Sequence, residues 1–153
     1  MKNTNVILGV LLVLALVPCV NGCARAARNT EGFAMVDGVV IDAPFTETWQ
    51  AAKSVLRESK YDIYTRDKRG LFVAYPGTTH KRFVHHRTQY TITLEAVSAK
   101  STRVTVETLK QVYGVTLMTY PGWHDRKTTD NSQTLALLEA VKAKVAGQTA
   151  AAS

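Results

Sequence analysis

Histidine and cysteine are among the residue types that most often bind zinc or act as activated nucleophiles. The four histidines are His80, His85, His86 and His124. A zinc ion needs three or four ligands in a tetrahedral array. In an extended chain His80 and His86 would share one face while His85 would point to the other, and residues 78–87 contain three cations and no carboxylate. Neighbouring positive charge opposes a dication, so we expect neither a metal site nor another cofactor.

Hydrolytic chemistry has equally little support. His124 and Asp125 are adjacent, so their side chains do not naturally form a proton relay, and the chain has no Gly-x-Ser-x-Gly motif. Both cysteines, Cys19 and Cys23, belong to the leading segment, which leaves no thiol nucleophile in the body of the chain. We therefore expect no enzymatic activity and no catalytic residues.

Basic and aromatic side chains gather in two less regular segments, residues 78–87 and 121–127. Cations beside exposed aromatic rings suit an anionic, amphipathic partner such as a membrane interface or an acidic protein patch. If the two segments meet in the folded chain, they form one binding surface; if they lie at opposite ends, they are two solvated loops. The candidate binding residues are Lys81, Arg82, Phe83, Arg87, Trp123, Arg126 and Lys127.

The first 22 residues have the parts of an export signal. Lys2 is the only charged residue before Arg25, and an unbroken apolar run covers residues 6–17. As a helix this run would measure about 18 Å, which is too short to cross a hydrocarbon layer of roughly 30 Å. A basic start, a short apolar middle and small residues beyond it predict a signal peptide over residues 1–22.

The end of this segment, Val20-Asn21-Gly22-Cys23, resembles the lipobox of bacterial lipoproteins, in which a branched apolar, a variable and a small residue precede a cysteine. The resemblance implies that Cys23 becomes the lipidated first residue of the mature chain. Two or more acyl chains hold a protein firmly to a bilayer, whereas one gives marginal binding. The alternative is ordinary cleavage near Gly22 or Ala26, which would release a free periplasmic protein.

The mature chain would have 131 residues, the size of one domain. It would carry 18 lysines and arginines against 12 acidic residues. This balance agrees with an anionic partner, such as a lipid headgroup, lipopolysaccharide or a cell-wall polymer, or simply with solubility. Nucleic acid is not expected as a partner outside the cytoplasm. With Cys19 removed and Cys23 lipidated, no disulfide can form, so the fold must rely on packing.

Hydrophobic periodicity predicts a single α+β domain over residues 34–146, between a tether over residues 23–33 and a disordered tail over residues 147–153. The predicted order is strand, helix, hairpin, two long strands, helix. Strict alternation predicts an antiparallel sheet of about five strands with one covered and one wet face, and the helices should pack together on the covered face. The predicted strands cover residues 34–43, 61–66, 70–75, 88–97 and 102–111, and the predicted helices cover residues 45–59 and 130–146.

Apolar stripes at helical spacing predict which helix faces are buried. Trp49 is expected to be a core anchor rather than a ligand contact. Asp130 with Gln133 resembles a capping box at the start of the last helix, and Gly147 is expected to end it. Residues 121–127 are expected to form a surface loop. The stripes consist of Phe45, Trp49, Ala52, Val55 and Leu56 in the first helix and Leu135, Leu138, Val141 and Val145 in the second.

Three short segments carry a resemblance to known proteins: Phe45-Thr46-Glu47-Thr48-Trp49, Tyr61-Asp62-Ile63 and Asp67-Lys68-Arg69-Gly70. With the element order and the cysteine anchor, they resemble the small helix-grip lipoproteins of Gram-negative envelopes, which include the domains of the BamC lipoprotein of the outer-membrane assembly machinery. The resemblance covers roughly residues 34–146. It implies an antiparallel sheet with two helices on one face, and no activity, because a fold does not determine function.

The resemblance also implies a location. In enteric bacteria an aspartate after the lipidated cysteine favours retention in the inner membrane, so Ala24 would favour the periplasmic face of the outer membrane. We therefore expect a lipid-anchored, non-catalytic binding or accessory subunit of an outer-membrane complex. Its expected partners are the membrane, through the N-terminal lipid, and other envelope proteins, anionic lipid or cell-wall polymer. A soluble periplasmic module that binds an anionic ligand is the alternative, and a periplasmic enzyme is a third.

Overall fold

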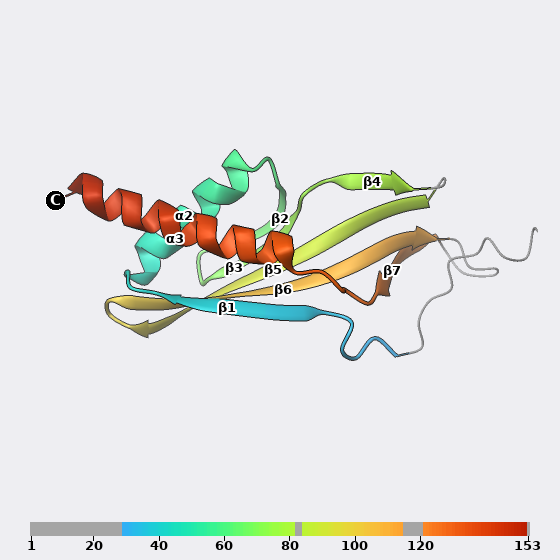
Figure 1. Ribbon diagram of the computed structural model, residues 1–153, viewed down its shortest axis with the longest axis horizontal. Helices are drawn as coiled ribbons and strands as arrows, with labels where there is room; N and C mark the ends of the chain where they lie inside the picture. The colour runs from blue at the N-terminus through green and yellow to red at the C-terminus, as the bar shows by residue number, and fades with distance from the viewer. Residues whose placement is uncertain (1–28, 82–83, 115–120, 153) are drawn as a thin grey trace, which may run out of the picture.

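The computed structural model describes residues 29–81, 84–114 and 121–152, which form one antiparallel sheet with two helices on one of its faces (Figure 1). This confirms the predicted α+β fold. The elements are, in chain order, β1 (Met35–Ile41), α2 (Phe45–Glu58), β2 (Asp62–Asp67), β3 (Leu71–Tyr75), β4 (Thr78–Lys81), β5 (Val84–Ser98), β6 (Ser101–Gly114), β7 (Gly122–Arg126) and α3 (Ser132–Ala152).

The main path of the sheet has the order β1-β6-β5-β3-β2, and these five strands correspond to the five that the sequence predicts. β5 and β6 form a long hairpin, with 15 and 14 residues. The outer edge of each strand pairs with one strand over its first half and with another over its second half. One end of the hairpin lies between β1 and β3, and the other lies between β7 and β4. We call this second end the distal half of the sheet: β4, residues 84–89 of β5, residues 109–114 of β6, and β7.

The core lies between the helices and the covered face of the sheet. The predicted alternation in the long hairpin is confirmed, because Tyr90, Ile92 and Leu94 on β5 and Val104 and Val106 on β6 are all buried. The expected stripe of α2 is also buried apart from Phe45, which is half-buried and packs against the core. Because these side chains alternate with exposed polar ones, the opposite face of the sheet is wet.

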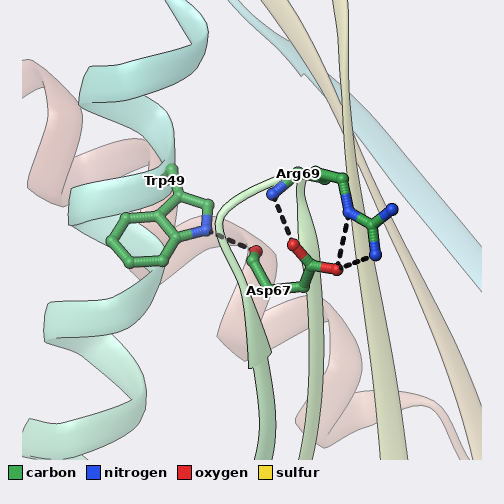
Figure 2. A network of polar contacts seen from close by, with 3 residues as sticks. All are labelled: Trp49, Asp67 and Arg69. Carbon is green, nitrogen blue, oxygen red and sulfur yellow. Dashed lines mark hydrogen bonds and ion pairs between the residues drawn. The ribbon is translucent and has the colours of Figure 1, made fainter.

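The side chains of Trp49 and Arg69 hold the turn between β2 and β3 through Asp67 (Figure 2), and Gly70 lets this turn approach β5. The buried indole of Trp49 donates from Nε1 to the Asp67 carbonyl at 3.0 Å, so this side chain is a core anchor as predicted. The Asp67 carboxylate accepts from the Arg69 backbone N–H and guanidinium. Gly70 has φ +111°, and a Cβ there would lie 2.3 Å from the Leu94 carbonyl oxygen, so only glycine fits.

One of the two less regular segments matches an alternative that the sequence leaves open, and the other differs from its prediction. Residues 78–87 suit a loop or an extension of the sheet, and their described residues form the extension, as β4 and the start of β5, whereas the predicted surface loop at residues 121–127 forms β7. The long hairpin extends beyond the helices, and its outer backbone groups need partners there. β4 and β7 supply those partners. Because no helix covers this part of the sheet, neither strand shows the one-sided alternation by which strands are recognised.

Helix α3 differs from the prediction at both ends. The predicted cap is confirmed in part, because the Asp130 carboxylate accepts from the Ser132 N–H at 3.0 Å. Asn131 precedes the helix and its carbonyl accepts from the Leu135 N–H. The reciprocal half of a capping box does not form, because the Gln133 side chain accepts from the Tyr90 hydroxyl. The helix continues through Gly147 to Ala152, so the expected disordered tail is wrong over these residues. One glycine inside a helix costs about 1 kcal/mol relative to alanine, and the alanines that follow favour continuation.

The buried face of α3 is rotated relative to the predicted stripe. Leu138, Val141 and Val145 are buried as expected, but Leu135 is 47% exposed. Thr134 and Leu137 are buried in its place. The Thr134 hydroxyl lies 2.6 Å from that of Thr108 on β6, so a polar pair inside the core sets this orientation, which hydrophobicity alone does not reveal.

Candidate binding surface

The structure brings together the two segments that carry the candidate binding residues. Lys81 ends β4, Arg87 lies on β5, and Trp123 and Arg126 lie on β7, with Lys127 directly after it. All of them belong to the distal half or adjoin it, on either side of β6. Cys23, Arg82 and Phe83 lie outside the described residues. The two segments meet at Arg87 and Trp123, which share one face of the sheet, whereas the strand register places Lys81 and Arg126 on the opposite face.

Arg87 is the residue through which the two segments make contact. Its guanidinium carbon lies 4.5 Å from the ring centroid of Tyr75 and 4.1 Å from that of Trp123. Its Nε–H donates to the Gln111 side chain at 2.7 Å, and the Gln111 amide donates to the Asp125 carboxylate at 2.9 Å. A planar cation between two aromatic faces is stabilised by the ring quadrupoles. We call these five residues the Arg87 cluster.

The cluster lies on the sheet face opposite the helices, because its members alternate with the buried residues of β3, β5 and β6. It is extended along the sheet by further aromatic rings. Tyr113, 38% exposed, packs edge-on against Trp123 with centroids 5.4 Å apart, and His85 packs against Tyr113 in turn. On the other side, Tyr64 lies against Tyr75. The exposed rings and the held cation together form an amphipathic face.

The opposite face of the distal half is polar and basic. Strand pairing aligns His86 with Val112 and His124, and Thr88 with Lys110 and Arg126. A cavity of about 400 Å³ opens on this face beside the start of α3. Its lining contains no carboxylate, and a small anion would meet Lys110 and His86 there beside apolar groups such as Pro76. The cavity is lined by Pro76, Gly77, Thr79, His86, Arg87, Thr88, Lys110, Gln111 and Gln133.

A hydrogen-bonded tyrosine lies where this cavity borders the core. Tyr90 is 1% exposed and donates to the Gln133 side chain at 2.8 Å. Burial, and secondarily the neighbouring Tyr61 and Asp130, raise the pKa of Tyr90 to about 12. The hydroxyl therefore stays protonated through the neutral range and acts as a donor. Its role is to position Gln133, which lines the cavity, rather than to transfer a proton.

His124 has the least satisfied polar group of this region. Its Nε2 is buried and has no hydrogen-bond partner among the residues that the structure describes. The imidazole lies on the cavity side of β7, opposite Val112.

Within the described ranges, no three histidine, cysteine or acidic side chains converge as metal ligands. Likewise, no helix of the described chain is long and apolar enough to cross a membrane.

Sequence reasoning missed four members of this surface: Tyr75, Gln89, Gln111 and Tyr113. Tyr75 donates to the Gln89 side chain at 3.0 Å, which supports the ring against which Arg87 stacks. The signal was present in part, because Tyr75, Gln89 and Gln111 lie at the ends of predicted strands, whereas Tyr113 lies two residues beyond the predicted end at residue 111. Their partner across the sheet, β7, was not recognised as a strand, so nothing connected them.

The comparisons with known proteins do not assign a family. No protein-family model and no curated protein matches the sequence. Among solved structures, the chain is similar to one described as "Crystal structure of Ara h 8.0201", at 9% sequence identity and a TM-score of 0.37, over 74% of this chain and 97% of that one. A similarity this distant says nothing about function.

Proposed function

We propose that this chain is a lipid-anchored, non-catalytic binding protein of the bacterial envelope, with an accessory role in an outer-membrane complex. The observation that carries the binding function is the Arg87 cluster, in which Arg87 and Trp123 pack at 4.1 Å. This contact joins the two segments through one cation and one aromatic ring, which supports the proposal. The lipid anchor is supported by the lipobox-like sequence that ends at Cys23, and Ala24 supports sorting to the outer membrane.

Anchoring is tested by metabolic labelling with palmitate in the native host. We expect label on the wild-type protein, none on the Cys23→Ala variant, and retention of the wild type in the membrane fraction after a high-salt wash. A salt wash removes proteins held by charge alone, whereas acyl chains remain in the bilayer. Palmitate on the Cys23→Ala variant, or release of the wild type by salt, would contradict the proposal.

The contact surface is tested by crosslinking in cells. Arg87→Ala combined with Trp123→Ala should abolish crosslinks to neighbours, because it removes both the held cation and the ring that holds it. A matched control is Arg103→Ala with Val97→Ala, which removes an exposed cation and an exposed apolar side chain at the other end of the sheet. Equal loss of crosslinks in both pairs would show that the distal half is not the contact surface.

A soluble periplasmic module that binds a small anion is the second candidate. The observation that favours it is the cavity of about 400 Å³ whose lining contains His86 and Lys110 and no carboxylate. Under this alternative, Lys110→Gln would weaken capture of an anionic ligand while palmitate labelling of the chain would be absent. Palmitate labelling and the salt wash therefore separate the two candidates.

A further inference from the structure

The N-terminal tether leaves the folded body beside the distal half of the sheet. The Phe33 carbonyl accepts a hydrogen bond from the Thr128 N–H at 2.8 Å, and Thr128 follows β7 by two residues. β1 then runs away from this end, antiparallel to β6. Figure 1 shows the described N-terminal residues near β7 and the C-terminus at the opposite end of the molecule.

The length of the tether limits how far the distal half can lie from the anchor. Phe33 is ten positions after Cys23, and ten extended residues span at most about 35 Å. Two residues after Phe33, Met35 pairs with Thr108, and the far turn at Ser101 lies about 23 Å from Thr108 along β6. An acyl chain at Cys23 would therefore place the distal half nearer to the exit of the tether than the far turn.

The excess positive charge of the described residues is concentrated in the distal half. Residues 76–81, 84–89, 109–114 and 121–128 contain five lysines and arginines and one acidic residue. The other described residues contain 10 basic and 11 acidic side chains, which nearly balance. The single acid, Asp125, is already bonded to Gln111. Charge complementarity thus points to an anionic partner at this end.

Aromatic side chains at the same end suit a lipid surface more than a free anion. Tyr113 is 38% exposed and packs against Trp123, and the exposed Lys127 follows β7. Tyrosine and tryptophan prefer the boundary between apolar tails and headgroups, because the ring is apolar at one end and polar at the other. A small soluble anion would use the cations but not the rings.

We infer that the distal half of the sheet lies on the bilayer to which Cys23 is anchored and binds the phosphate groups of anionic lipids there. This inference rests on the proposed lipidation. It gives the binding surface a partner, the headgroup region of the membrane, and it orients the body so that the turn between β5 and β6 and the end of α3 point away from the lipid.

The orientation is tested with the purified mature protein in vesicles of phosphatidylcholine alone or mixed with phosphatidylglycerol. A donor dye is placed at Thr129→Cys, beside the distal half, or at Ala99→Cys, in the far turn; both positions are exposed. Energy transfer to headgroup-labelled lipid should be stronger from position 129 than from position 99, and it should increase when phosphatidylglycerol is present. Equal transfer from both positions, or no dependence on anionic lipid, would overturn the inference.

Charge reversal tests the phosphate contacts. Lys110→Glu with Lys127→Glu should reduce the ratio of docked to undocked protein by about 30-fold or more, because each lysine near an anionic surface contributes roughly a factor of five. The single Lys127→Glu variant, at an exposed position, should reduce it about fivefold. The control pair, Lys100→Glu with Lys142→Glu, makes the same change in net charge at exposed sites elsewhere and should have no effect. Equal losses in both pairs would overturn the inference.

Palmitate labelling and energy transfer in native membranes show which part of the inference is wrong when docking is not observed. Palmitate on the protein together with equal transfer from both dye positions would overturn the docking while leaving the anchor intact. Absence of palmitate would overturn the anchor on which the docking rests. A difference between the two positions that is seen in native membranes but not in protein-free vesicles would assign the distal half to a membrane protein and overturn lipid binding.

Discussion

At the scale of single residues, Arg87 shows how a cation can serve structure and binding together. Its guanidinium is held between Tyr75 and Trp123 while Nε bonds to Gln111. Such a stack restricts the side chain, so little conformational entropy remains to be lost when a partner binds. Lysine at this position would supply the charge without the planar stack.

Arg87→Lys should therefore loosen the distal half without unfolding the body. Each cation–π contact contributes about 0.5–1 kcal/mol and the Nε–H bond about 1 kcal/mol. We expect amide hydrogen exchange in β7 to become about tenfold faster, which corresponds to about 1.4 kcal/mol, while exchange in β3 stays the same. Arg66→Lys, at an exposed position of β2, is the control. Unchanged exchange in β7 would show that other contacts hold the strand.

Tyr90 predicts a pH dependence of stability. Its pKa of about 12 in the folded chain lies above the value of about 10 expected when unfolded. The stabilisation by the neutral phenol is complete below pH 10 and is lost as the pH rises from about 10 to 12, because the unfolded chain then ionises first. Tyr90→Phe should cost about 1 kcal/mol at pH 7, through the lost bond to Gln133.

The Tyr90→Phe variant should also be less sensitive to alkali than the wild type. Urea unfolding at a series of pH values from 7 to 11.5 measures both effects. The gap in stability between the two proteins should shrink above pH 10, since the phenylalanine has no proton to lose. A constant gap over the whole range would contradict the assigned pKa.

At the scale of elements, the sequence predicted the parts of the sheet that the helices cover and not the parts that they leave open. The five strands of the main path alternate clearly because Tyr90, Val104 and their neighbours face a covered core. β4 and β7 have polar residues on both faces, so periodicity could not identify them. They are strands because the long β5–β6 hairpin needs partners for its backbone groups, which is a tertiary cause.

The same limit explains how much of the binding surface could be predicted. Arg87, Trp123, Arg126 and Lys127 were identified from composition, which is local information. Gln111 and Tyr113 become part of the surface only when β7 pairs with β6. No sequence pattern predicts that pairing. A strand prediction for residues 122–126 would have been sufficient to find them.

Thr128 follows β7 and bonds to β6 and to the segment before β1. Replacing its hydroxyl should lower the free energy of unfolding. Its hydroxyl donates to the Thr108 carbonyl and accepts from the Lys110 N–H, both at 3.1 Å. Thr128→Val keeps the shape but leaves these backbone groups unpaired, at a cost of about 1–3 kcal/mol. The neighbouring Thr129→Val, at an exposed position, should change the free energy of unfolding by less than about 0.5 kcal/mol. Equal effects in urea unfolding would contradict the assigned role.

Two glycines offer a matched test of the turn held by Trp49. Gly70 and Gly77 both have positive φ, +111° and +106°, but a Cβ at Gly70 would meet the Leu94 carbonyl at 2.3 Å, whereas a Cβ at Gly77 meets nothing within 4 Å. Gly77→Ala should cost about 1–2 kcal/mol from backbone strain alone. Gly70→Ala should cost about 1–3 kcal/mol more, because the backbone must shift. Similar unfolding free energies for the two variants would show that the close approach is relaxed at little cost.

At the scale of the whole molecule, the proposed lipidation and the basic end of the sheet would act together. Acyl chains at Cys23 would hold the chain at the bilayer and thereby raise the effective concentration of the basic surface there. This advantage depends on a short tether that leaves the body beside the basic end. Phe33 and Thr128, bonded at 2.8 Å, provide that exit.

Lengthening the tether should therefore weaken docking even though no contact changes. A flexible Gly/Ser insertion after Ala27 that makes the tether about three times as long lowers the effective concentration roughly as the −3/2 power of length. We expect the docked-to-undocked ratio, measured by energy transfer from position 129, to fall about fivefold. The same insertion after Ser153, at the opposite end of the chain, should leave the ratio unchanged. If both insertions gave the same transfer, the body would dock without help from its anchor, and the coupling between tether and surface would be wrong.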